Sequence, residues 1–142
     1  RAALHRWLSL LLASSLAARG GVDAEVAHAA VLRARLCELL AETGGHRAAA
    51  GPLFLVGLFS LMDALLGTPM EELVGKIDLA PDVRAALLER EGPYASWLQL
   101  VEAYEAGAWE DMTRLAAPLG VSPLEVPEVY LEALSWAREQ MK

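Results

Sequence analysis

Cysteine is almost absent from this chain, which has a single one, Cys37, among 142 residues. An intrachain disulfide is therefore impossible, and the fold does not depend on the cross-links that stabilise many small secreted domains. This usage fits a reducing compartment, and we expect a cytoplasmic protein. Because the negative charge of the adjacent Glu38 disfavours a thiolate, we interpret Cys37 as a buried, unreactive thiol.

Positive charge is also scarce, with 12 Lys and Arg against 19 Asp and Glu and a net charge of −7. A broad nucleic-acid surface normally carries a basic stripe that neutralises phosphates, and no such stripe is present. Arg33 and Arg35 are close in sequence but point in different directions around a helix, and Glu38 lies three residues beyond Arg35. We therefore predict local ion pairs for both arginines and no nucleic-acid partner.

Long uninterrupted hydrophobic runs are missing although 55% of the residues are apolar. The longest run, residues 53–62, is interrupted by Gly57 and Ser60 and closes at Asp63. It is much shorter than the ~20 residues that cross a bilayer, so we predict no membrane span. The apolar fraction exceeds the roughly 45–50% typical of globular domains, which suggests that some apolar surface binds a partner.

No segment alternates apolar and polar residues as a half-buried strand does, so we predict an all-α fold. The length suits one compact bundle of about seven to eight helices in a single domain, residues 1–142. A hinge is predicted near residues 89–93, which read Glu-Arg-Glu-Gly-Pro. The expected helices are 2–18, 24–43, 52–66, 69–76, 81–90, 94–106, 108–117 and 123–141.

Two of the expected helix starts carry capping signals. Thr68 and Ser122 are each followed by a proline, which suits the first helical position, and by a glutamate that can complete a capping box. Pro127 removes a backbone donor early in the last helix, so we expect its regular part to begin late or to bend there.

The expected first helix presents an apolar face that includes Leu4, Trp7, Leu8 and Leu11 at helical spacing. No methionine precedes Arg1, so we expect a domain truncated at its N-terminal side. Such a truncation would expose part of this face or cover it by self-association, which makes a homo-oligomer one predicted outcome. Trp109, directly after Gly107 and Ala108, is a further candidate for the interface.

Four segments together resemble a known family: residues 6–8 (Arg-Trp-Leu), 32–41 (Leu-Arg-Ala-Arg-Leu-Cys-Glu-Leu-Leu-Ala), 54–62 and 130–137. Their order resembles the HDOD domain, the HD-related output domain, which is a non-catalytic relative of the HD phosphohydrolases in bacterial signalling proteins. The chain looks most like the version that follows an EAL domain, the module associated with cyclic di-GMP hydrolysis. The resemblance implies a degenerate HD-like helical fold and a regulatory role, with any phosphodiesterase activity in an EAL domain outside this sequence.

The resemblance also implies a vacated metal site. In HD hydrolases a His-Asp dipeptide follows a Gly-Leu-Leu run and helps to hold a metal that activates water. Here Gly57-Leu58-Phe59 leads into Ser60-Leu61, whose side chains cannot replace those ligands. Asp63 is the one acid inside the apolar helix, and we expect it to be solvated or paired with an arginine. We predict no catalytic residue, metal or cofactor.

Small residues offer another explanation for the lost ligands. Gly57, Ser60, Ala64 and Gly67 form a line along the helix that would let a second helix approach closely and fill the former site. His5, His28 and His46 show no metal-ligand spacing, so we interpret them as surface residues.

Three functions remain open at this point. The favoured one is a non-catalytic module that binds a partner protein or an upstream EAL domain. The second is a sensor of a small ligand or nucleotide, with a pocket between helices near Arg33 or Arg35. The third, a metal-dependent phosphohydrolase with an unrecognised site, is disfavoured by Ser60-Leu61 and would be revived by bound metal.

Overall fold

The computed structural model describes residues 22–75 and 78–140. The expected helix 2–18, with Leu4, Trp7, Leu8 and Leu11, lies outside these residues, as does His5.

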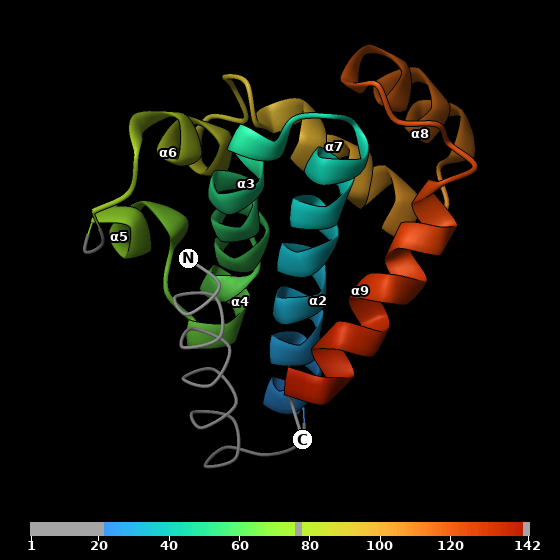
Figure 1. Cartoon of the computed structure of the whole chain (residues 1–142). Helices are drawn as coiled ribbons and strands as arrows, with labels where there is room; N and C mark the ends of the chain where they lie inside the picture. Colours follow the sequence, from blue (N-terminus) through green and yellow to red (C-terminus); the bar gives the residue numbers. More distant parts are fainter. Residues whose placement is uncertain (1–21, 76–77, 141–142) are drawn as a thin grey trace.

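The described part of the chain consists of helices joined by turns and contains no strand, which confirms the all-α compact bundle. Figure 1 labels the helices from α2, and their bounds are α2 (Val22–Thr43), α3 (Arg47–Phe59), α4 (Met62–Leu66), α5 (Met70–Gly75), α6 (Pro81–Leu88), α7 (Ala95–Glu105), α8 (Trp109–Ala116), a 3-10 turn (Ala117–Leu119) and α9 (Val126–Gln140).

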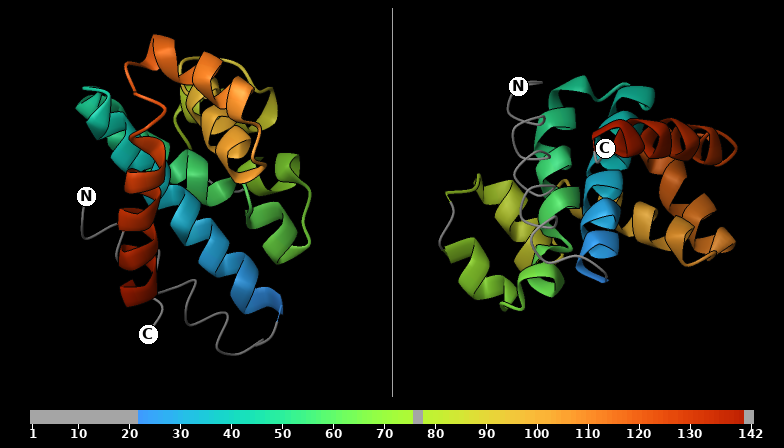
Figure 2. Two further views of the ribbon diagram at one scale, coloured as in Figure 1. Left: turned by 90° about the vertical axis from the view of Figure 1, so that its right-hand side faces the viewer. Right: turned by 90° about the horizontal axis from the view of Figure 1, so that it is seen from below.

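Helix α2 is the centre of the bundle, with α3 along one side and α9 crossing the other (Figure 1). Seen from below in Figure 2, α4 to α6 lie on the α3 side of the molecule and α7 to α9 lie on the α2 side. Residues 30–41 of α2 are all buried or half-buried, as expected for a helix that is apolar nearly all round. One contiguous hydrophobic core includes side chains from α2, α3 and α5 to α9.

Helices α2 and α3 approach each other closely at Gly57. A Cβ atom at this position would lie 2.7 Å from the carbonyl oxygen of Arg33 and 2.8 Å from the Cα atom of Ala34. Real Cβ atoms do not approach backbone this closely, so only glycine fits. The predicted close approach of a second helix is confirmed at this residue.

Ala64 and Gly67, the last two residues of the small-residue line, do not serve close packing, and that part of the prediction is wrong. Ala64 is exposed, and a Cβ atom at Gly67 would meet nothing within 4 Å. Gly67 instead has a φ of 64°, in the left-handed region that favours glycine, and ends α4. A small residue that ends a helix and one that permits a crossing look identical in the sequence.

The expected helix 52–66 is also corrected. Helix α3 begins earlier, at Arg47, and contains Pro52, and it ends at Phe59 before α4 begins at Met62. The Ser60 hydroxyl donates a hydrogen bond to the carbonyl oxygen of Gly57 at 2.7 Å. A side chain that bonds its own backbone in this way competes with helix continuation, which accounts for the break.

The last helix begins at Val126 rather than 123, in line with the late start expected from Pro127. The capping contacts predicted for Ser122 and Glu125 do form, but they lie in the turn that precedes the first residue of α9. The Ser122 hydroxyl accepts a hydrogen bond from the amide of Leu124, and the Glu125 carboxylate accepts one from the amide of Ser122, both at 3.3 Å. The other helices end within one or two residues of their expected bounds in the described part of the chain.

The predicted hinge, residues 89–93, connects α6 to α7. Arg90 has a φ of 57° and Gly92 a φ of 88°. The Arg90 guanidinium donates two hydrogen bonds, at 2.6 and 2.8 Å, to the Glu102 carboxylate of α7. The connection is thus attached to α7, and hinge motion stays a prediction.

One stretch, residues 47–64, is long and apolar enough to cross a membrane by length and composition. In this structure the stretch is interrupted after Phe59, and Leu53, Phe54 and Val56 are fully buried in the core. A core helix has the same composition, so this stretch is weak evidence for a span.

We predict that Gly57→Ala lowers the free energy of unfolding by about 1–3 kcal/mol, because the new methyl group overlaps the backbone of α2. Gly75→Ala is the matched control, since a Cβ atom there meets nothing within 4 Å, and it should have little effect. Urea unfolding followed by circular dichroism measures both. Equal stability of the two variants would contradict backbone contact at Gly57.

Candidate functional site

The two residues at the expected His-Asp position, Ser60 and Leu61, lie in the break between α3 and α4. The Ser60 hydroxyl accepts a hydrogen bond from Nη1 of Arg33 at 3.0 Å and donates one to the carbonyl oxygen of Gly57. Both its donor and an acceptor site are therefore used internally. Leu61 packs, half-buried, against the hydrophobic core.

Arg33 connects three helices. From α2 its guanidinium contacts Ser60 after α3 and forms two hydrogen bonds with the Glu105 carboxylate of α7, one of them from Nε to Oε2 at 3.2 Å. The Arg33 side chain is 12% exposed and that of Glu105 is 32% exposed. Two-point pairing between a guanidinium and a carboxylate fixes both orientation and charge. We call Ser60, Arg33 and Glu105 the Arg33 network.

The local ion pair predicted for Arg33 is wrong, because its partner Glu105 lies 72 residues away in the sequence. The prediction for Arg35 is confirmed, since its Nη1 pairs with Glu38 three residues on. The Arg35 guanidinium also lies 5.2 Å from the ring centroid of Trp136, in a cation–π contact, and its buried Nε has no hydrogen-bond partner.

Asp63 does not join Ser60 in a site. It lies in the first turn of α4, and its Oδ1 accepts a hydrogen bond from the amide of Ala64 at 2.8 Å. In the part of the chain that the structure describes, no three His, Cys, Asp or Glu residues are grouped to hold a metal ion. His28 lies half-buried on α2, and His46 packs edge-on to Trp97 with ring centroids 5.3 Å apart.

Cys37 is fully buried in α2, and its exclusion from water raises the pKa of the thiol to about 12. The nearby positive charge of Arg33 opposes this shift, and the carboxylates of Glu105 and Glu102 add to it. The predicted burial of Cys37 is confirmed, and the raised pKa keeps the thiol protonated at neutral pH, in line with an unreactive cysteine.

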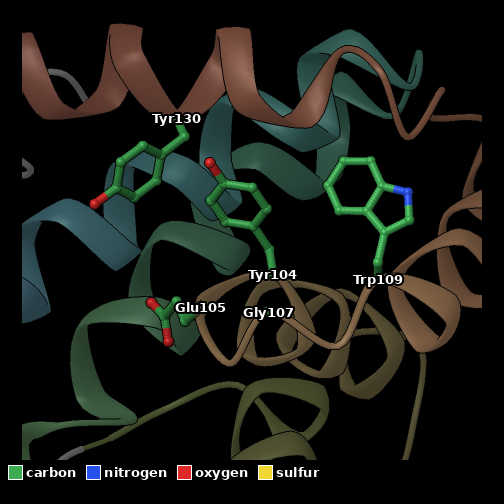
Figure 3. Close-up of a pocket in the computed structure, with 5 residues that line it drawn as sticks. All are labelled: Tyr104, Glu105, Gly107, Trp109 and Tyr130. Atoms are coloured by element: carbon green, nitrogen blue, oxygen red, sulfur yellow. The ribbon is translucent and has the colours of Figure 1, made fainter.

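Of the predicted interface positions, Trp109 lies in the part of the chain that the structure describes. It lines an open groove of about 410 Å³ (Figure 3). Its ring is 50% exposed. The other lining residues are Tyr104, Glu105, Gly107 and Tyr130. The rings of Tyr104 and Tyr130 lie 5.2 Å apart between centroids, and burial together with Tyr130 raises the pKa of the Tyr104 phenol. We call this the aromatic groove.

Sequence reasoning missed the contributions of Tyr104, Tyr130 and Glu105 to this groove. The residues come from the end of α7 and from α9, and their meeting depends on how these helices pack. The one local signal is Gly107, which has a φ of 70° and forms the sharp turn between α7 and α8.

The described part of the chain is an all-α helical bundle, and its sequence is similar to those of two bacterial proteins. It is 35% identical over 136 residues, 96% of its length, to cyclic di-GMP phosphodiesterase CdgJ of Vibrio cholerae. It is 34% identical over 139 residues to the uncharacterized protein YuxH of Bacillus subtilis. The chain spans about a third of the length of these relatives, 31% and 33%. No protein-family model and no solved structure matches it.

We predict that Arg33 and Glu105 stabilise the fold as a coupled pair. In a double-mutant cycle of Arg33→Met and Glu105→Gln, the coupling energy should be about 1–3 kcal/mol, because the guanidinium is largely buried. Arg114→Met with Asp111→Asn is the matched control, since that pair is exposed, and its coupling should stay below about 0.5 kcal/mol. Urea unfolding measures both cycles. Equal coupling energies would show that the Arg33 network does not hold the helices together.

Proposed function

We propose that the chain is a non-catalytic regulatory domain of a bacterial cyclic di-GMP signalling protein and acts by binding another protein. The observation that carries the proposal is the similarity of nearly the whole chain to one third of a protein named cyclic di-GMP phosphodiesterase. A segment of that size, without the rest of the relative, suits a regulatory part better than a complete enzyme. We assign it to the HDOD domains on the motifs around residues 32–41 and 54–62.

The Arg33 network supports a non-catalytic role. Water activation by a metal needs open ligand positions, and the polar groups nearest to the expected site bind one another instead. Leu61 supplies only hydrocarbon, and Asp63 is turned to the amide of its own helix. Because Arg33, Glu105 and Asp63 already bind groups of the chain itself, none of these charged side chains is directed at a substrate.

The nucleotide-sensor alternative is less well supported at its proposed position. A phosphate near Arg33 would have to displace Glu105, and one near Arg35 would have to displace Glu38. Both exchanges cost an existing charge-assisted hydrogen bond. Protein binding requires no such exchange.

Regulation of this kind depends on different affinities for two states of the partner. We propose that the partner is an EAL domain, carried upstream in the same cytoplasmic protein, which would supply any cyclic di-GMP hydrolysis. A second copy of the chain is the alternative partner. Membrane and nucleic-acid partners are not proposed.

The proposal predicts that the chain can replace the matching third of CdgJ. In the chimera, cyclic di-GMP hydrolysis should resemble that of CdgJ and differ at least threefold from that of CdgJ lacking this third. The chain alone should hydrolyse no cyclic di-GMP with magnesium or manganese present. Initial rates for each of these proteins, measured by chromatography of the nucleotide products, provide the test.

A chimera carrying Gly57→Leu is the matched control, because the larger side chain disrupts the crossing of α2 and α3. It should behave like the deletion. Hydrolysis by the chain alone would contradict the non-catalytic role, and a chimera indistinguishable from the deletion would contradict the regulatory one.

A further inference from the structure

The aromatic groove presents three aromatic rings to solvent on one side of the bundle. Figure 3 shows Tyr130 projecting from α9, Tyr104 from α7 and Trp109 from the start of α8, with the three rings in a row along the groove. Tyr104 and Tyr130 support each other, with their centroids 5.2 Å apart. The rings provide flat apolar faces that water covers in the free chain.

The backbone of Trp109 is positioned by a turn at Gly107. Gly107 has a φ of 70°, and the amide of Trp109 donates a hydrogen bond to the carbonyl oxygen of Gly107 at 3.0 Å. Trp109 is nevertheless 50% exposed. Tryptophan, with a large apolar ring and a polar N–H, is enriched among the residues that dominate binding energy at protein interfaces.

The groove has an acidic border. Glu105 lines it directly, and an adjoining open cavity of about 280 Å³ is lined by Trp109, Ala108, Glu110 and Asp111. No lysine or arginine is among the lining residues that the structure describes for either cavity. The raised pKa keeps the Tyr104 phenol neutral, so the negative charge comes from the carboxylates.

Two of the three carboxylates already have cationic partners, and the third is available. Glu105 pairs with Arg33 and Asp111 pairs with Arg114. Glu110, exposed in the first turn of α8, forms no ion pair with any residue that the structure describes. The unpaired carboxylate therefore belongs to a residue that lines the same cavity as Trp109.

We propose that an arginine side chain from a basic segment of the partner protein binds where the aromatic groove meets the adjoining cavity, with the guanidinium stacked on Trp109, which lines both, and directed to the carboxylate of Glu110, which lines the cavity. A planar cation gains from the electron-rich ring face and from the carboxylate at the same time. The unpaired negative charge of Glu110 favours a cation over an anion such as a nucleotide phosphate as the occupant. This inference rests on one part of the proposed function, namely that the domain acts by binding another protein.

The probe is a blocked five-residue peptide, Ala-Arg-Ala-Arg-Ala, added to the chain in a nuclear magnetic resonance titration. The indole N–H signal of Trp109 is assigned with Trp109→Phe. It should shift saturably with a millimolar dissociation constant, while the indole signals of buried Trp97 and of Trp136 should not move. The same peptide with citrulline in place of arginine keeps the shape and loses the charge, and should bind at least fivefold more weakly.

Three variants locate the contact. Trp109→Ala lacks the indole reporter and is followed through the backbone amide signals of Gly107 and Glu110, where saturable shifts should be absent. Glu110→Gln, followed at the Trp109 indole, should weaken binding at least twofold. Leu124→Ala is the matched control, because Leu124 is a large apolar residue that is more exposed than Trp109, at 77%, and lies outside the lining of both cavities. Peptide binding by this variant should be unchanged. Equal binding of the citrulline peptide, or unchanged binding by Trp109→Ala, would overturn the proposal.

The chimera separates this inference from the proposed function. If Trp109→Ala leaves hydrolysis by the chimera unchanged while the chimera still differs from the deletion, the groove proposal fails and the regulatory function stands. If the chimera equals the deletion while the peptide binds at Trp109, the regulatory function fails and the groove stands. A dimer in light scattering that Trp109→Ala converts to a monomer would identify a second copy as the occupant and overturn the basic partner.

Discussion

Backbone contact between α2 and α3 at Gly57 is the constraint on which the other features depend. The distance of 2.7 Å from a hypothetical Cβ atom to the carbonyl oxygen of Arg33 leaves no room for a side chain. Because the backbones meet there, Arg33 of α2 reaches Ser60 one turn after Gly57, and the Ser60 hydroxyl turns back to the Gly57 carbonyl. One glycine thereby positions the polar contacts around the helix break.

Those polar contacts extend to the surface. Glu105 accepts hydrogen bonds from Arg33 and also lines the aromatic groove, so one carboxylate belongs both to the helix crossing and to the candidate binding surface. A two-point pair holds the end of α7 against α2, and α7 carries Tyr104 into the groove. The interior of the bundle therefore supports the shape of the surface that we propose to bind arginine.

Features that depend on neighbours in the sequence were predictable. The helical pattern, the buried Cys37, the pair of Arg35 with Glu38 and the need for a small residue at Gly57 all follow from local spacing. The partner of Arg33 and the residues around Trp109 were not, because α2, α7 and α9 meet only through tertiary packing. The break at Ser60 was missed for a different reason. Ser60 lies within an apolar run that looks like one continuous helix, and the sequence does not show that its hydroxyl bonds the Gly57 carbonyl where the helix ends.

The proposal that the chain is non-catalytic is tested most directly by its metal content. The purified chain is incubated with manganese, iron, zinc and magnesium, freed of excess ions and measured by elemental analysis. The account predicts far less than one metal ion per chain, because Ser60 and Leu61 supply no ligands and Arg33 brings a positive charge to that position. One or two tightly held ions per chain would contradict it and would restore the phosphohydrolase alternative.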